Sequence, residues 1–141
     1  MANEVALTAA RIALVDVRDA EIYSFKAAAA LTEGQALYFV AANGTVGVAD
    51  ANDGGKEQFR GIALQAVAAG QTVDILKRGY VAGFTVSALT HDDPIYLSDT
   101  AGSLSTAVGT MTVNCARVVS RNDKDLTKVL YIDANWNRIW A

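Results

Sequence analysis

The sequence predicts a mainly β protein, a compact antiparallel β-barrel or sandwich built from two related hairpin units, with an N-terminal arm. Three observations support this prediction. Short runs rich in aromatic and β-branched residues alternate with turns that contain glycine or asparagine from Gly34 onward. Two stretches of the chain match each other as hairpins. The chain has 141 residues, of which 52% are hydrophobic, so one domain with one core is the default.

The first unit begins with a hairpin. Residues 35–40 and 45–48 flank Asn43 and Gly44. An Asn-Gly pair between two such runs is typical of a β-hairpin with a type I′ turn. A polar loop is expected at residues 50–55, and further strands are expected at residues 59–66, 72–77 and 80–86.

The second unit repeats the pattern. Residues 92–97 and 103–106 flank a turn at Ala101 and Gly102. When residues 92–107 are aligned with residues 34–49, Tyr96 matches Tyr38 and Gly102 matches Gly44. A strand follows each copy, at residues 60–64 and 115–119, and a last strand is expected at residues 128–133. Each unit is too small to fold alone, so we expect the two units to share one core.

The chain is therefore divided into residues 1–33, an N-terminal arm and leading strand, residues 34–135, the β domain, and residues 136–141, a C-terminal tail. In the first part, residues 21–26 read as a strand, whereas residues 5–17 fit a short helix or an extended arm. Apolar residues in this segment would be unfavourable in water. We expect them to lie across a neighbouring subunit or another protein, and packing onto the chain's own core is the alternative. The residues are Val5, Leu7, Ile12, Leu14 and Val17.

Both tryptophans of the chain lie in the tail, at Trp136 and Trp140. Large aromatic residues near a terminus either fold back on their own core or anchor a contact with another subunit, where tryptophan is enriched. Trp136 and Trp140 are therefore candidate interface residues.

The composition excludes several classes of function. A net charge of −3 gives no attraction to nucleic acid or to an anionic membrane. One cysteine, Cys115, and one histidine, His91, cannot form a Cys/His zinc site, and no phosphate-binding loop is present, so we expect no metal and no cofactor. His91 beside Asp92 could serve a hydrolase, but a polar turn before Pro94 explains the same residues. We therefore expect a protein that is not an enzyme.

No signal peptide and no run of apolar residues long enough for a membrane helix is apparent in the sequence. We expect the protein to be made in the cytoplasm and to have no membrane partner.

The hairpin motifs resemble those of the capsid decoration, or head cement, proteins of tailed bacteriophages. The resemblance covers residues 34–119. It rests on Gly34 to Tyr38, on the Asn43-Gly44 turn, on Gly61-Ile62-Ala63 and on Gly70 to Val73 followed by Gly79. The second hairpin at residues 92–97 also fits, with Asp92 where that family usually has glycine.

The resemblance implies a structural virion protein that binds the outer surface of an expanded phage capsid and stabilises it. It also implies that the major capsid protein is the partner, that the protein is a homotrimer, and that it lies on the capsid surface of the virion. Two other classes remain open. One is another non-enzymatic phage part, such as a tail-tube or fibre domain, and the other is a carbohydrate-binding β-domain.

Overall fold

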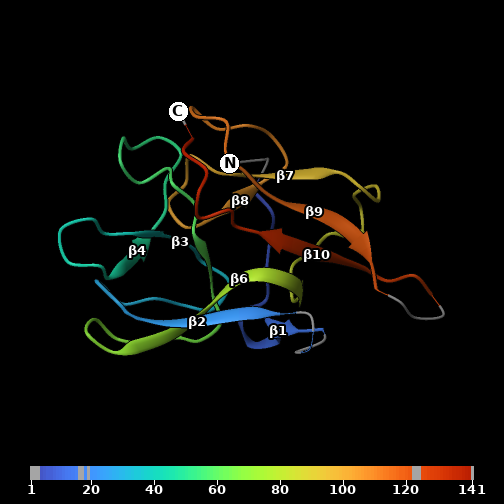
Figure 1. Cartoon of the computed structure of the whole chain (residues 1–141). Coiled ribbons are helices and arrows are strands. Elements are labelled where there is room, and N and C mark those ends of the chain that lie inside the picture. Colours follow the sequence, from blue (N-terminus) through green and yellow to red (C-terminus); the bar gives the residue numbers. More distant parts are fainter. Residues whose placement is uncertain (1–3, 16–17, 19, 122–124, 141) are drawn as a thin grey trace.

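A computed structural model describes residues 4–15, 18, 20–121 and 125–140. The chain is mainly β, and the described residues contain one 3₁₀ turn and no α-helix (Figure 1). The elements are η1 (Ala9–Arg11), β1 (Ala13–Leu14), β2 (Glu21–Lys26), β3 (Ala36–Phe39), β4 (Val46–Val48), β5 (Gly61–Ala63), β6 (Thr72–Ala82), β7 (Pro94–Leu97), β8 (Leu104–Ser105), β9 (Asn114–Ser120) and β10 (Lys128–Asp133).

All ten strands form one antiparallel sheet that curls into a half-barrel. The order β4-β3-β5-β6-β10-β9-β7-β8 is symmetric about the β6–β10 pair, while β1 and β2 both pair with the opposite edge of β6. Each half has a hairpin, β3–β4 or β7–β8. The first strand of each hairpin also pairs with the strand that follows the hairpin, which is β5 in one half and β9 in the other. The prediction of an antiparallel β fold with two related hairpin units is therefore confirmed.

Loops connect the two ends of the sheet. The amide of Gly102 donates to the carbonyl of Ala49 at 2.7 Å, and the amide of Ala36 donates to the carbonyl of Gly102 at 2.9 Å. These bonds hold the turn of the second hairpin against the open end of the first hairpin, where β3 begins and β4 has just ended, so the curled sheet encloses a core.

The turns differ in detail from the prediction. The chain reverses over residues 41–44 between Val40 and Thr45, and of the predicted pair only Gly44 has a positive φ, of 75°. Asn43 instead accepts hydrogen bonds on its side-chain oxygen from the amide and hydroxyl of Thr45. The turn is therefore not type I′, because that type needs positive φ at both central residues. Asp92 has a φ of 72°, a conformation that Asp tolerates better than most residues.

Two clusters of buried side chains fill the half-barrel. The larger lies between the two units and includes Phe59, Ile95 and Leu130. The smaller lies among β3, β4, β5 and the first half of β6, and includes Leu37 and Ile75.

The predicted N-terminal arm is not shown. Val5 is only 7% exposed, and Leu7, Ile12 and Leu14 pack partly buried against the larger cluster. Backbone bonds tie the segment to the sheet: the Val5 amide donates to Leu104, and β1 pairs with β6. The physical reason is that the apolar residues find a place on the chain's own core and need no partner to leave water. Val17 lies outside the described residues.

Candidate functional site

The C-terminal tail folds back on the β domain. Trp140 is 4% exposed, and its backbone amide and carbonyl bond the side-chain amide of Gln58 at 2.9 and 2.7 Å. Arg60 donates from one guanidinium nitrogen to the carbonyls of Asn135 and Arg138 at 3.2 and 3.0 Å. Burial lowers the pKa of Arg60, but an arginine remains charged at neutral pH. Side chains of residues far from the tail in sequence thus fix its path.

Trp136 lies in a cluster of aromatic side chains. Its indole nitrogen donates to the carbonyl of Arg60 at 2.7 Å, and its ring centroid lies 4.9 Å from that of Tyr23 and 5.2 Å from that of Phe39. Phe25 lies 4.9 Å from Phe39, and the amine of Lys77 lies 4.7 Å from the centre of the Trp136 ring. We call these four aromatic side chains, together with the lysine that lies over one of them, the aromatic cluster: Tyr23, Phe25, Phe39, Trp136 and Lys77.

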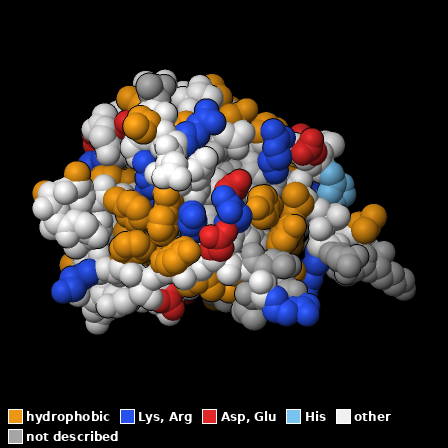
Figure 2. Space-filling view, viewed as in Figure 1, with side chains coloured by type: hydrophobic (Ala, Val, Ile, Leu, Met, Phe, Trp, Pro, Cys, Tyr) orange, Lys and Arg blue, Asp and Glu red, His pale blue; other side chains and the backbone are white. Residues whose placement is uncertain are grey.

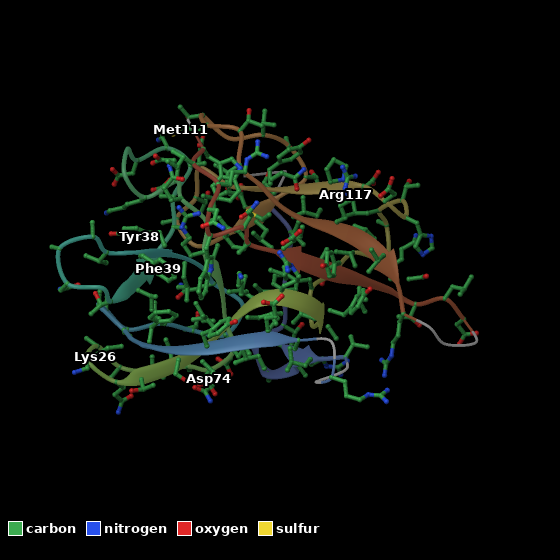
Figure 3. All side chains as sticks on the ribbon, viewed as in Figure 1. Lys26, Tyr38, Phe39, Asp74, Met111 and Arg117 are labelled. Carbon is green, nitrogen blue, oxygen red and sulfur yellow. The ribbon has the colours of Figure 1, made fainter. Side chains whose placement is uncertain are left out.

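The aromatic cluster covers the smaller core and is partly open to solvent. Phe25, Phe39 and Trp136 pack against the buried residues of that core, while Tyr23 is 43% exposed. Figure 2 shows hydrophobic side chains gathered on this face beside a band of charged ones, and Figure 3 places Phe39 there.

The charged band is a network of ion pairs. Arg78 bonds Asp133 at 3.0 Å and Glu21 at 2.9 Å, and Lys77 lies 3.6 Å from Glu21. The hydrogen bond to Asp133 and the nearby carboxylates raise the pKa of Arg78. The ion pairs join residues of β2 and β6 and Asp133 at the end of β10. They lie beside the aromatic cluster, because Lys77 takes part in both.

The tail exposes an aliphatic side chain that the sequence reasoning missed. Ile139 lies between Trp136 and Trp140, the two residues predicted to form an interface. It is 82% exposed, the largest value among the exposed large hydrophobic residues of the described chain. Trp136 and Trp140 lie an even number of residues apart, whereas Ile139 lies an odd number of residues from each of them. The tail turns between Asn135 and Arg138, whose amide donates to the Asn135 carbonyl at 3.1 Å, and Arg138 is exposed although it lies an even number of residues from both tryptophans. Strand alternation therefore does not predict the exposure of Ile139.

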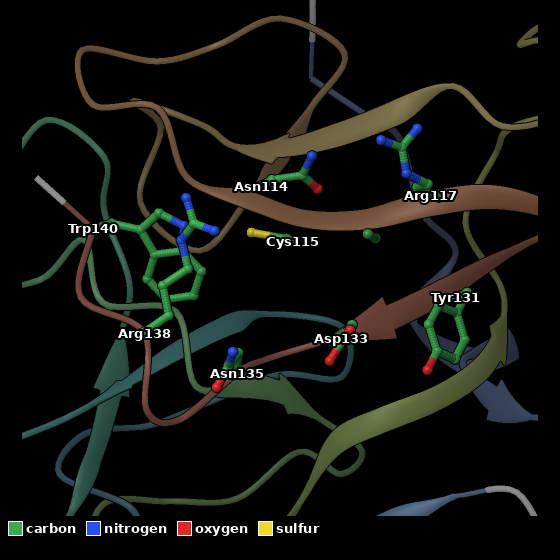
Figure 4. Close-up of a pocket in the computed structure, with 9 residues that line it drawn as sticks. Asn114, Cys115, Arg117, Tyr131, Asp133, Asn135, Arg138 and Trp140 are labelled. Atoms are coloured by element: carbon green, nitrogen blue, oxygen red, sulfur yellow. The ribbon is translucent and has the colours of Figure 1, made fainter.

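A cleft of about 400 Å³ lies beside the tail, between it and the ends of β9 and β10 (Figure 4). In the part of the chain that is described, the amide of Asn114, the hydroxyl of Tyr131 and the guanidinium of Arg138 have no hydrogen-bond partner. Burial raises the pKa of Tyr131, so its hydroxyl stays a donor well above neutral pH. The lining residues are Asn114, Cys115, Ala116, Arg117, Tyr131, Asp133, Asn135, Arg138 and Trp140.

The two residues that the sequence offers for chemistry are His91, which does not line this cleft, and Cys115, which does. His91 is exposed, and the backbone and side chain of Asp93 bond Thr90 in the turn that precedes β7. Cys115 is 1% exposed, and burial raises its pKa well above its ordinary value, which keeps the thiol protonated. Among the described residues, no group of three His, Cys, Asp or Glu side chains is placed to hold a metal ion.

Comparisons with known proteins give no relative. No family model, no curated protein and no solved structure matches the chain. Over the described residues, the structure has no helix with both the length and the apolar character needed to span a bilayer.

Proposed function

We propose that this protein is a structural virion protein that binds the outer surface of an expanded phage capsid and stabilises it. The partner is the major capsid protein, and the protein acts as a decoration or cement protein on the capsid surface. The support is the resemblance of residues 34–119 to such proteins, together with an antiparallel β fold that carries paired hairpins.

The observation that carries the proposal is the display of Ile139. An aliphatic side chain that is 82% exposed loses contact with water when a partner covers it, which contributes about 1.5–3 kcal/mol for full burial. Gln58, Arg60 and the inward-facing tryptophans hold the backbone around Ile139, so little ordering is left to be done on binding. The neighbouring Arg138 adds a charged group beside the anchor.

A homotrimer belongs to the same proposal. The three tails of one trimer would bind three sites of a repeating shell at the same time. Once one tail is bound, the other two are at a high effective concentration near their sites, so contacts that are weak singly give a high overall affinity. Because the protein would bind the assembled shell and not its separate subunits, it would stabilise the shell by mass action.

The test is co-sedimentation with purified expanded heads, with Ile139→Ser compared with Leu126→Ser. Leu126 is also exposed, at 56%, but it precedes β10, at the end of that strand away from the tail. We expect Ile139→Ser to lose most binding and Leu126→Ser to bind as the wild type, with unchanged circular dichroism for both. Heads that fail to bind the wild-type protein, or equal binding by both variants, would contradict the proposal.

The cleft favours a second candidate, a carbohydrate-binding β-domain. The cleft holds an amide, a hydroxyl and a guanidinium that have no hydrogen-bond partner among the described residues, although the guanidinium lies over the Trp140 ring. Such groups in a concave site of this size suit a ligand with many hydroxyls. A glycan array tests it: we would expect binding that is lost in Asn114→Ala and kept in Ile139→Ser.

A further inference from the structure

The cleft beside the tail carries one positive charge that the described residues do not balance. Its lining holds two arginines and one aspartate. The guanidinium of Arg117 lies 2.7 Å from the carbonyl and 3.5 Å from the carboxylate of Asp92. The carboxylate of Asp133 is paired with Arg78 at 3.0 Å. Arg138 has no carboxylate partner in the part of the chain that is described. The cleft is therefore a positive site on a chain whose net charge is −3.

The tail holds Arg138 in place without neutralising it. The guanidinium carbon lies 5.6 Å from the centre of the Trp140 ring. The backbone of Arg138 donates to the Asn135 carbonyl at 3.1 Å and accepts from Arg60 at 3.0 Å. A guanidinium that lies over a ring keeps its N–H groups, which lie in its own plane, for an acceptor. Arg138 is thus a positioned cation with free donors.

The cleft also borders a buried donor that has no acceptor. Trp140 is 4% exposed, and among the described residues its indole nitrogen is the one buried side-chain nitrogen or oxygen without a hydrogen-bond partner. Figure 4 shows the Trp140 ring projecting from the tail toward Cys115, on the side of the cleft where Arg138 lies. Buried polar groups in proteins are nearly always paired, so this nitrogen indicates an acceptor that the described chain does not supply, from a ligand or a water.

The other polar groups of the cleft suit hydroxyls. The amide of Asn114 and the hydroxyl of Tyr131 have no partner in the described part of the chain. Asp133 accepts from Arg78 on Oδ1, and its side chain is 48% exposed. Figure 4 shows Asn114 and Asp133 on opposite sides of the cleft, with Tyr131 at the end away from Trp140. Because a hydroxyl both donates and accepts, the hydroxyls of one sugar ring can bond the carboxylate on one side and the amide on the other.

We propose that the cleft binds an acidic sugar, a ring that carries one carboxylate as well as its hydroxyls. The carboxylate bonds Arg138, whose planar fork of donors matches two carboxylate oxygens, and the ring hydroxyls bond Asn114 and Asp133. A carboxylate brings one negative charge, which equals the charge that the lining leaves unbalanced, whereas a phosphate brings about 1.5 to 2. The volume of about 400 Å³ is within the range of small-ligand sites. Such binding goes beyond the proposed capsid role and rests on the second candidate function, a carbohydrate-binding β-domain.

A titration followed by heteronuclear NMR of the amide and indole N–H groups tests the ligand class. The probes are the methyl glycosides of glucuronic, galacturonic and mannuronic acid, each compared with the neutral methyl glycoside of the same sugar. The members of each pair differ only in a carboxylate that replaces a hydroxymethyl group. We expect at least one uronide to bind about tenfold more tightly than its neutral counterpart, a difference of about 1.4 kcal/mol. Acetate, which has the carboxylate but no hydroxyls, should bind more weakly than that uronide.

The indole signals locate the site. The chain has two tryptophans, so its spectrum contains two indole N–H signals, and Trp140→Phe assigns them. We expect the uronide to shift the Trp140 indole signal and the side-chain amide signals of Asn114. The indole N–H of Trp136 is already bonded to the Arg60 carbonyl at 2.7 Å, so its signal should move little.

Two arginine variants separate the cleft from the general charge of the protein. We expect Arg138→Gln to weaken uronide binding at least about tenfold and to change the affinity for the neutral glycoside less than about twofold. Arg121→Gln is the matched control, because it removes the same charge directly after β9, at the end of that strand away from Asn114. It should leave both affinities unchanged, with the same circular dichroism for both variants.

The outcomes distinguish this inference from the functions proposed above. Failure of every probe to bind overturns the acidic-sugar site together with the carbohydrate candidate. A neutral glycoside that binds as tightly as its uronide, or an equal loss in the two arginine variants, overturns the acidic-sugar site alone. The capsid proposal is tested separately, by Ile139→Ser on heads.

Discussion

At the scale of single residues, Trp136 joins the tail to both cores. Its nitrogen bonds the Arg60 carbonyl, its ring touches Tyr23 and Phe39, and Lys77 lies over its face. We predict that Trp136→Phe lowers the free energy of unfolding by about 2–3 kcal/mol, because it removes a hydrogen bond and leaves a cavity. Urea unfolding measures this loss. The exposed Ile139→Ser serves as control and should change stability by less than about 0.5 kcal/mol.

Cys115 predicts a pH dependence. Burial raises its pKa in the folded protein, whereas the thiol of the unfolded chain ionises near pH 8.5. The unfolded state therefore releases a proton that the folded state keeps, and stability falls as pH rises above about 8.5, by up to about 1.4 kcal/mol per pH unit. Urea unfolding of wild type and Cys115→Ala from pH 7 to 10 measures the effect. The difference between them should shrink as pH rises, and a constant difference would show that Cys115 ionises equally in both states.

At the scale of elements, the hairpins were predictable and the N-terminal segment was not. Local patterns fix a hairpin, because the turn residues and the alternating strands lie within about fifteen residues of one another in the sequence. The repeat at Tyr38 and Tyr96 also predicted two related units, and the symmetric strand order agrees with that prediction. By contrast, the position of residues 4–14 depends on bonds to β6 and β8, which lie far along the chain. The apolar residues of this segment follow neither the helix period nor the strand period, so the sequence alone fitted an arm as well as a packed segment.

The candidate site shows the same limit. The tail was predicted from Trp136 and Trp140, but their inward orientation depends on Gln58 and Arg60, more than seventy residues away in the sequence. Hydrogen bonds over such separations leave no local pattern. The exposure of Ile139 was not predictable from strand alternation either, because the tail turns between Asn135 and Arg138.

The packing of the N-terminal segment on β6 predicts the effect of a substitution at Gly83. This residue has a φ of 105°, and a Cβ there would lie 2.8 Å from backbone atoms of Arg11 and Ile12. We predict that Gly83→Ala lowers the free energy of unfolding by about 2–4 kcal/mol, through backbone strain and displacement of the segment. Gly54→Ala is the matched control, because a Cβ there meets nothing within 4 Å. Equal stability of the two variants in urea would mean that residues 11–12 do not pack on the sheet.

At the scale of the whole molecule, the tail connects the two cores. Trp140 is part of the larger core, and Trp136 packs against both clusters. The larger core in turn takes residues from both hairpin units and from the N-terminal segment. A change that loosens one part therefore removes contacts from the others, which favours a single cooperative unfolding transition.

Both tryptophans of the chain lie in the tail, so fluorescence reports on the tail while far-ultraviolet circular dichroism reports on the sheet. We predict that the two signals change together during urea unfolding, with one midpoint, because the tail cannot leave without exposing Trp140 and uncovering the smaller core. Arg60→Met, which removes the bonds to the Asn135 and Arg138 carbonyls, should lower both midpoints equally. A fluorescence transition at lower urea than the dichroism transition would mean that the tail unfolds as a separate unit. Ile139 would then be displayed by a mobile segment, and ordering that segment on binding would cost part of the affinity that its burial contributes.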